Sequence, residues 1–169
     1  GKFFVIYADP PWAFDNSGFE QSAESQYPTM TTDELCNHCD IAELVGEQGV
    51  LFLWVPNSMI GDGLKVCEAW GLEYKTNRTW IKDRSPGIGW YVKSKHETLL
   101  IATRGQGVFP KEKPDSWFKA EVQGHSRKPD CVYTDIEAMY PGPYIELFAR
   151  RPRNGWTSWG NEIREPEAT

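Results

Sequence analysis

Four consecutive residues near the start of the chain, Asp9-Pro10-Pro11-Trp12, have the chemistry to hold an amino group. Asp9 offers a carboxylate oxygen and Pro10 a backbone carbonyl, so two hydrogen-bond acceptors stand close together. Both prolines lack an N–H and fix φ at about −65°, which makes the corner stiff and free of competing donors. Trp12 adds a flat ring on which a purine can stack, a contact worth about 1–3 kcal/mol per base. The pattern favours a site for the exocyclic amino group of adenine, whose two hydrogens both need an acceptor.

The motif directly follows a short apolar run, Phe3 to Ala8, which is typical of a strand buried on both faces of a parallel sheet. Four further strands are predicted, over residues 49–55, 72–82, 98–102 and 144–149. Helices are predicted from caps and stop signals, over residues 31–44, 59–70 and 130–140. This alternation indicates an α/β fold with a central sheet that helices flank.

Two strand ends carry a concentration of polar groups. One is the turn Asp9–Trp12, called the Asp9 corner below, and the other is the stretch from Arg150 to Asn154 after the last predicted strand. Ligands of such sheets bind beyond the carboxyl ends of the strands, so we expect the site where these two ends meet. Residues 104–129, which are polar and rich in Gly and Pro, are predicted to form an irregular excursion.

Charge is unevenly distributed along the 169 residues, whose formal net charge is −6. Residues 1–74 hold two basic and twelve acidic side chains, whereas residues 75–153 hold fifteen basic and nine acidic ones. Such asymmetry suits a protein with one face for phosphates, and the alternative is an ordinary solvated surface. The length predicts a single domain, residues 1–169.

No metal site and no membrane span are expected. Cys36-Asn37-His38-Cys39 has the spacing of a zinc knuckle, but no second pair of ligands follows it. We therefore expect reduced thiols, as in a cytoplasmic protein. The chain also lacks an apolar run long enough to cross a bilayer.

The hexapeptide from Tyr7 to Trp12 resembles the signature of the DPPW-type adenine methyltransferases, the family of the catalytic subunit that methylates adenosine in eukaryotic mRNA and of its bacterial and phage relatives. Similar segments follow in order along nearly the whole chain, at residues 27–31, 49–55, 80–82, 96–100, 126–130, 144–151, 154 and 160–162. The resemblance implies a Rossmann-like S-adenosylmethionine-dependent methyltransferase fold with a mostly parallel sheet. It further implies methyl transfer to the N6 amino group of adenine in a nucleic acid.

The resemblance also implies roles for the residues of the motif. Asp9 and the Pro10 carbonyl would hold the target amino group, on a corner completed by Pro11 and Trp12. Tyr27, on the segment that follows, would help to close the site, although a packed core aromatic is an equal alternative. No metal is needed, because alignment of the amino nitrogen with the methyl carbon is catalysis by proximity.

A second set of residues would bind the cofactor by the same resemblance, namely Asp9, Lys128, Arg150, Arg151, Asn154, Asn161 and Glu162. Lys128 would serve the methionine carboxylate of the donor or support the site from behind. Asn161 and Glu162 would bind the ribose hydroxyls. A gap-free match favours Arg150 for the carboxylate and ribose, whereas the pattern Pro152-Arg153-Asn154 favours Arg151, and the choice stays open.

Two features depart from the family pattern. The family usually has an Asp and an apolar residue upstream that contact the cofactor adenine, but the sequence begins only eight residues before Asp9. No Gly-x-Gly-x-x-Gly is present near the cofactor strand, where Ala149-Arg150-Arg151 stand instead. This second departure disfavours other dinucleotide-binding folds.

The expected partner is a nucleic acid whose target base is unstacked or flipped out. DNA is favoured over RNA, because family members that act on mRNA usually carry long extra regions. The basic segments 82–95 and 104–128 would bind the sugar-phosphate backbone of the nucleic acid. The sequence is compatible with a homo- or hetero-oligomer. A cytoplasmic protein of a bacterium, or one encoded by a phage, is favoured. Three alternatives remain: a catalytically silent scaffold for a partner methyltransferase, a plain nucleic-acid-binding module and a small-molecule methyltransferase.

Overall fold

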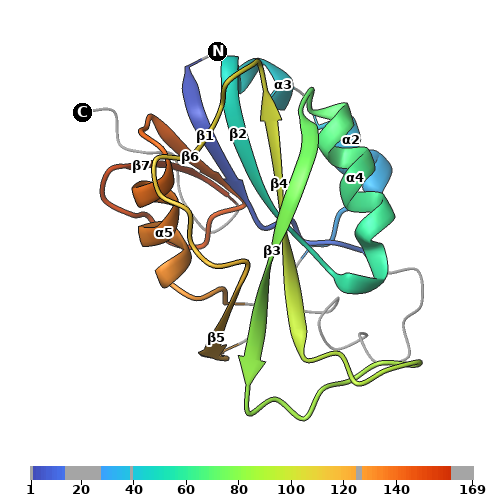
Figure 1. Ribbon diagram of the computed structural model, residues 1–169. Helices are drawn as coiled ribbons and strands as arrows, with labels where there is room; N and C mark the ends of the chain where they lie inside the picture. Colours follow the sequence, from blue (N-terminus) through green and yellow to red (C-terminus); the bar gives the residue numbers. More distant parts are fainter. Residues whose placement is uncertain (1, 14–27, 39, 125–126, 161–169) are drawn as a thin grey trace.

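The computed structural model describes residues 2–13, 28–38, 40–124 and 127–160. These residues form one twisted seven-stranded sheet with helices on both sides (Figure 1). The strands are β1 (Phe3–Ala8), β2 (Val45–Val55), β3 (Glu73–Asp83), β4 (His96–Arg104), β5 (Trp117–Glu121), β6 (Tyr144–Leu147) and β7 (Trp156–Trp159). The helices are α2 (Thr32–Cys36), α3 (Ile41–Leu44), α4 (Ile60–Ala69), which follows the 3-10 turn η1 (Asn57–Met59), and α5 (Cys131–Met139).

The strand order is β5-β3-β4-β2-β1-β6-β7. Neighbours pair in parallel except at β4, which is antiparallel to both β2 and β3. The expected α/β fold with a mostly parallel sheet is therefore confirmed. Because only β4 is reversed, its first residues lie at the same edge as the carboxyl ends of the other strands, and Asp9, at the end of β1, lies at this edge as well.

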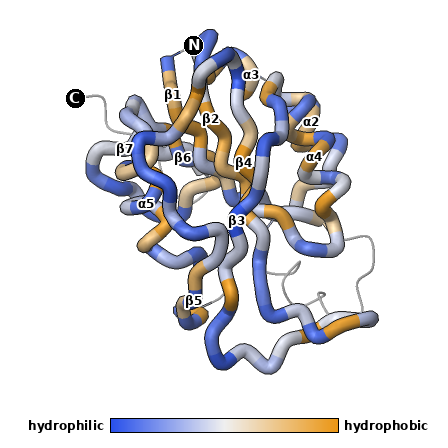
Figure 2. The backbone as a smooth tube through the Cα atoms, viewed as in Figure 1, coloured by the Kyte–Doolittle hydropathy of each residue, from blue (hydrophilic) through white to orange (hydrophobic). Residues whose placement is uncertain are grey.

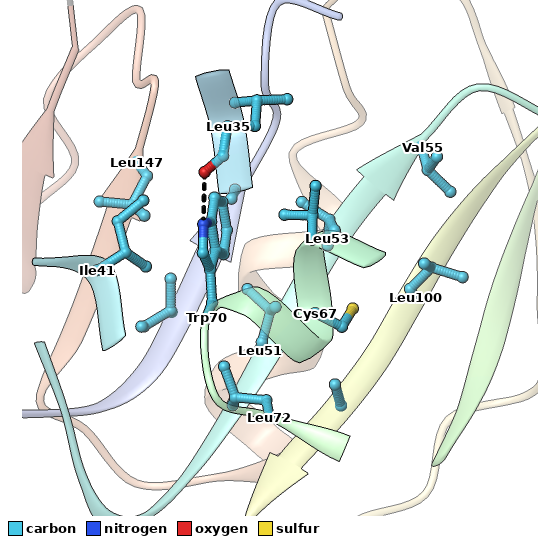
Figure 3. Packing of buried hydrophobic residues seen from close by; sticks show 14 of the residues in the cluster. Leu35, Ile41, Leu51, Leu53, Val55, Cys67, Trp70, Leu72, Leu100 and Leu147 are labelled. Carbon is cyan, nitrogen blue, oxygen red and sulfur yellow. Dashed lines mark hydrogen bonds between the residues drawn. The ribbon is translucent and has the colours of Figure 1, made fainter. Parts of the chain in front are cut away.

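Side chains of alternate residues in the central strands pack into two hydrophobic cores, one on each face of the sheet. In β1, Ile6 and Ala8 join the core under α2, α3 and α4, whereas Val5 and Tyr7 join the core under α5. Figure 3 shows the first core, in which the buried indole of Trp70 donates a 2.8 Å hydrogen bond to the carbonyl of Leu35. Each fully buried large apolar side chain contributes about 1.5–3 kcal/mol, so β1 is held firmly from both faces.

The predicted helix over residues 31–44 is divided into two short helices. The capping box is present, since the amide of Glu34 donates to the Thr31 hydroxyl and the amide of Thr31 to the Glu34 carboxylate, both at 3.1 Å. The prediction of one continuous helix is wrong because Asp40 has φ 69°, in the left-handed region, where a right-handed helix cannot continue.

Two of the strands, β5 and β7, were not predicted from the sequence. β5 lies inside the stretch 104–129 that was expected to be irregular, and β7 lies beyond the last predicted strand. Both are short edge strands with alternating or exposed side chains, so neither leaves the continuous apolar run that marks a central strand. Among the residues described, no helix is long and apolar enough to span a membrane.

Candidate active site

Backbone hydrogen bonds join the Asp9 corner to the chain segment around Met30. The Met30 amide donates to the Pro11 carbonyl at 2.8 Å, and the Ala13 amide donates to the Met30 carbonyl at 2.9 Å. The Pro10 carbonyl accepts from the Trp12 amide at 2.9 Å. A carbonyl oxygen has two lone pairs, so this bond leaves one for a ligand. The ends of the segment that contains Tyr27 are thus fixed beside the corner, while Tyr27 itself lies outside the described residues.

Trp12 does not present the free ring surface that the sequence favoured. Its side chain is only 6% exposed and belongs to the core under α2, α3 and α4. The indole N–H donates to the carbonyl of Trp54 at 2.9 Å, which ties the corner to the end of β2. In this conformation Trp12 fixes the position of Asp9 and Pro10 and offers no face to a base.

Four charged side chains form a chain of ion pairs along the edge of the sheet. The Lys128 ammonium lies 3.3 Å from Asp9 Oδ2 and 3.1 Å from Glu97 Oε1, and Lys82 lies 2.9 Å from Glu97 Oε2. Lys128 also sits over the ring of Trp54, with Nζ 5.5 Å from the centroid. Two carboxylates and two ammonium groups balance, so the network is neutral when all four are ionised.

Burial perturbs the pKa values of this network unevenly. Burial raises the pKa of Asp9, and the attraction of Lys128 offsets this only in part. For Glu97, the charges of Lys128 and Lys82 outweigh burial and lower the pKa. For Lys128, burial works against the charge, but the two carboxylates outweigh it and raise the pKa. Asp9 is therefore the carboxylate of the pair whose charged form burial disfavours on balance.

A further carboxylate lies beside this network on β6. Glu146 is buried and pairs in register with Tyr7 of β1. The hydroxyl of Tyr133, from α5, donates to both carboxylate oxygens of Glu146. Burial raises the pKa of Glu146 to about 7, and the charge of Asp9 adds to this, while the hydrogen bond from Tyr133 opposes it.

The two arginines after β6 act on different acids. Both arginines are exposed. The charge of Arg150 opposes the rise in the pKa of Asp9, and the charge of Arg151 opposes the rise in the pKa of Glu146. Arg153 is committed elsewhere, because it pairs with Glu137 of α5 at 2.9 Å. Asn154 is exposed in the turn before β7.

Three aromatic rings gather where β6 and β7 end. The His38 ring packs edge-on against Trp159 and Phe148, with centroids 5.1 and 6.0 Å apart. Its Nδ1 is buried and has no hydrogen-bond partner among the described residues. Gly160 lies against the backbone here, since a Cβ on it would come within 2.2 Å of the Ala149 carbonyl oxygen. An unsatisfied ring nitrogen beside two aromatic rings is an environment that suits a purine.

Comparison with known proteins identifies the family. The MT-A70 family model matches residues 3–162. The chain belongs to the MT-A70 family. It is 32% identical to the type II methyltransferase M.MunI from Mycoplasma sp, over 96% of this chain and 78% of that protein. It is 34% identical to the N(6)-adenosine-methyltransferase catalytic subunit METTL3 of Homo sapiens, and 31% to a putative N(6)-adenosine-methyltransferase MT-A70-like protein of Medicago truncatula. In both cases 96% of this chain is covered, but only 28% and 27% of the relative.

Within this MT-A70 chain, the structure brings together several of the residues that the sequence singled out. Asp9 and Lys128 are in contact, and Arg150 acts on the same carboxylate. Tyr27, Asn161 and Glu162 lie outside the described residues. Across the part of the chain that the structure describes, no group of side chains could hold a metal ion, and Cys36, Cys67 and Cys131 are free thiols.

Sequence reasoning missed three contributors to this site. Lys82 and Glu97 complete the ion-pair network; both lie in segments that resemble the family, 80–82 and 96–100, but neither was assigned to the active site. Glu146 did leave a signal, because it is a single carboxylate within the apolar run of residues 144–149. A charged residue in a buried strand rarely lacks a partner, so this pattern indicates a paired carboxylate at position 146.

Proposed function

We propose that this chain transfers a methyl group from S-adenosylmethionine to the N6 amino group of adenine in a nucleic acid. The observation that carries the proposal is the Asp9 corner, a stiff end of a central strand where a carboxylate and a carbonyl lie together and where neither Pro10 nor Pro11 has an N–H to compete. Membership of the MT-A70 family supports methyl transfer as the reaction class. We rank DNA ahead of RNA by analogy with the type II methyltransferase, to which the chain is similar over 96% of its length.

The residues at the edge of the sheet fit the proposed donor. S-adenosylmethionine supplies an electrophilic methyl group on a sulfonium. Its zwitterionic methionine end suits a place between Asp9 and Arg150, and its adenine suits the aromatic cluster of His38, Phe148 and Trp159, where the Nδ1 of His38 lacks a partner among the described residues. We further propose that Asn154, Asn161 and Glu162 bind the ribose of the donor.

The proposed chemistry uses Asp9 twice. Its carboxylate and the remaining lone pair of the Pro10 carbonyl accept the two amino hydrogens, which turns the nitrogen lone pair out of conjugation with the ring. Methylation leaves one proton too many on the nitrogen. Asp9 is placed to accept it, since its pKa is raised by burial. Lys128, paired with both Asp9 and Glu97, would keep Asp9 ionised and oriented before transfer.

The test is nucleoside mass spectrometry of DNA and RNA of the same sequence, incubated with the protein and S-adenosylmethionine. We expect N6-methyladenine in the DNA and a loss of about a thousandfold or more in Asp9→Asn, whose amide adds a competing donor. Glu68→Gln, which makes the same carboxylate-to-amide change on the exposed face of α4, should retain full activity. Circular dichroism and urea denaturation check that each variant still folds. Unimpaired methylation by Asp9→Asn would refute the mechanism, and nucleic-acid binding without methylation by the unaltered chain would favour the scaffold alternative.

A further inference from the structure

A hairpin of residues 84–95 connects β3 to β4 and exposes large apolar side chains. Tyr91 is 100% exposed, Trp90 76% and Val92 73%. The hairpin holds three basic residues, Arg84, Lys93 and Lys95, and no acidic one. Figure 1 shows it projecting beyond the sheet, and in Figure 2 hydrophobic and hydrophilic stretches follow each other along it. Large apolar groups gathered on one surface segment usually mark a contact site.

Hydrogen bonds at the tip and at the base stabilise the conformation of the hairpin. The amide of Ser94 donates to the Ile88 carbonyl at 3.0 Å, which closes the tip. At its base, the amide of Lys82 donates to the Lys95 carbonyl at 2.8 Å. Asn57, which follows β2, donates to the Ser94 hydroxyl at 2.9 Å and to the His96 carbonyl at 2.7 Å. The aromatic side chains are thus presented by a backbone with internal hydrogen bonds.

The base of the hairpin adjoins the candidate active site. Lys82, at the end of β3, and Glu97, at the start of β4, pair with each other at 2.9 Å. Glu97 in turn contacts Lys128, which contacts Asp9. A substrate whose adenine reaches Asp9 would therefore pass the hairpin with its neighbouring nucleotides.

We propose that this hairpin is a stacking clamp for unpaired bases next to the target adenine, an inference that rests on the proposed function. A base that is pulled out of its stack leaves neighbours without a stacking partner, and the ring of Tyr91, with Trp90, supplies one. Arg84, Lys93 and Lys95 bind the phosphates of the same strand, a complementarity that favours a nucleic acid over a protein as the occupant.

Fluorescence anisotropy with labelled single-stranded DNA and RNA of one sequence tests the clamp. Tyr91→Ala should weaken binding by about tenfold or more, because stacking is lost, whereas Tyr91→Phe should bind as the unaltered chain does. The slope of log affinity against log salt should stay the same in Tyr91→Ala. In Lys93→Ala and Lys95→Ala it should become shallower by about 0.7 for each phosphate that is no longer neutralised. Tyr74→Ala, which removes a partly exposed tyrosine at the start of β3, serves as the control and should bind normally.

The outcomes separate the clamp from the proposed function. Unchanged nucleic-acid affinity in Tyr91→Ala overturns the clamp, even if the unaltered chain methylates adenine. Tyr91-dependent binding without methylation by the unaltered chain supports the clamp and rejects the reaction. If light scattering shows that Tyr91→Ala dissociates an oligomer while nucleic-acid binding is retained, the surface binds protein and the clamp is wrong.

Discussion

A single ammonium group separates two carboxylates in the candidate active site. Lys128 is 3.3 Å from Asp9 and 3.1 Å from Glu97, and its side chain is largely buried. Removal of one partner from a buried ion pair costs about 3–5 kcal/mol, because the remaining charge then lacks its counter-charge. The protonation state of Asp9 therefore depends on two opposing effects, burial, which is the larger and raises the pKa, and the charge of Lys128, which lowers it.

We expect Lys128→Met to lower the activity and to shift the acid limb of the kcat/KM profile to higher pH. Without the ammonium, burial and the charge of Glu97 both raise the pKa of Asp9, so a higher pH is needed to ionise it. Lys128→Arg keeps the positive charge and should shift the profile much less. A pH–rate series from pH 5 to about 9 measures the effect, and coincident limbs for the two variants would contradict it.

Glu146 predicts a pH dependence of stability. Its pKa rises from an ordinary 4.5 to about 7 on folding, so its contribution is complete below the unfolded pKa and is lost as pH rises through 7. At about 1.4 kcal/mol per pKa unit, the loss is about 3 kcal/mol. We expect Glu146→Gln, which cannot ionise, to gain stability over the unaltered chain between pH 5 and about 8. Urea denaturation across this range measures the difference, and a constant difference would refute the assignment.

At the scale of the elements, Arg104 joins pieces that are distant in the sequence. From the end of β4, its guanidinium donates to carbonyls of Ala42, Val45, Gly46, Trp70 and Gly71. These carbonyls belong to α3, to the start of β2 and to the turn after α4. One side chain thus satisfies helix-end carbonyls that would otherwise lack partners.

Arg104→Ala should lower the free energy of unfolding by about 2–3 kcal/mol, because several charged hydrogen bonds are removed together. Arg84→Ala, which truncates an arginine whose side chain is 82% exposed, should change it by less than about 0.5 kcal/mol. Urea denaturation of both variants provides the comparison. Equal stability of the two variants would show that the Arg104 hydrogen bonds contribute nothing.

At the scale of the whole molecule, the positive charge is concentrated in residues 75–153 of an otherwise acidic chain. If these residues neutralise phosphates, log affinity for single-stranded nucleic acid should fall linearly with log salt, with a slope of about −0.7 per neutralised phosphate. Anisotropy titrations between about 50 and 200 mM NaCl measure the slope. Affinity for S-adenosylhomocysteine should change far less over this range, and a flat slope for the nucleic acid would exclude a phosphate-binding face.

The sequence by itself determined the features that depend on neighbouring residues. The apolar runs of β1 and β2, the capping box at Thr31 and the proline-stiffened corner after Ala8 are local, so they could be predicted. The reversed β4 and the edge strands β5 and β7 could not, because strand direction and pairing depend on residues far apart in the chain. For the same reason, the sequence did not predict three features of the site: the burial of Trp12, the ion pairs of Lys128 with Asp9 and Glu97, and the hydrogen bond between Tyr133 and Glu146. Only packing decides which charges share a low-dielectric space, and their proximity sets the pKa values on which the proposed chemistry depends.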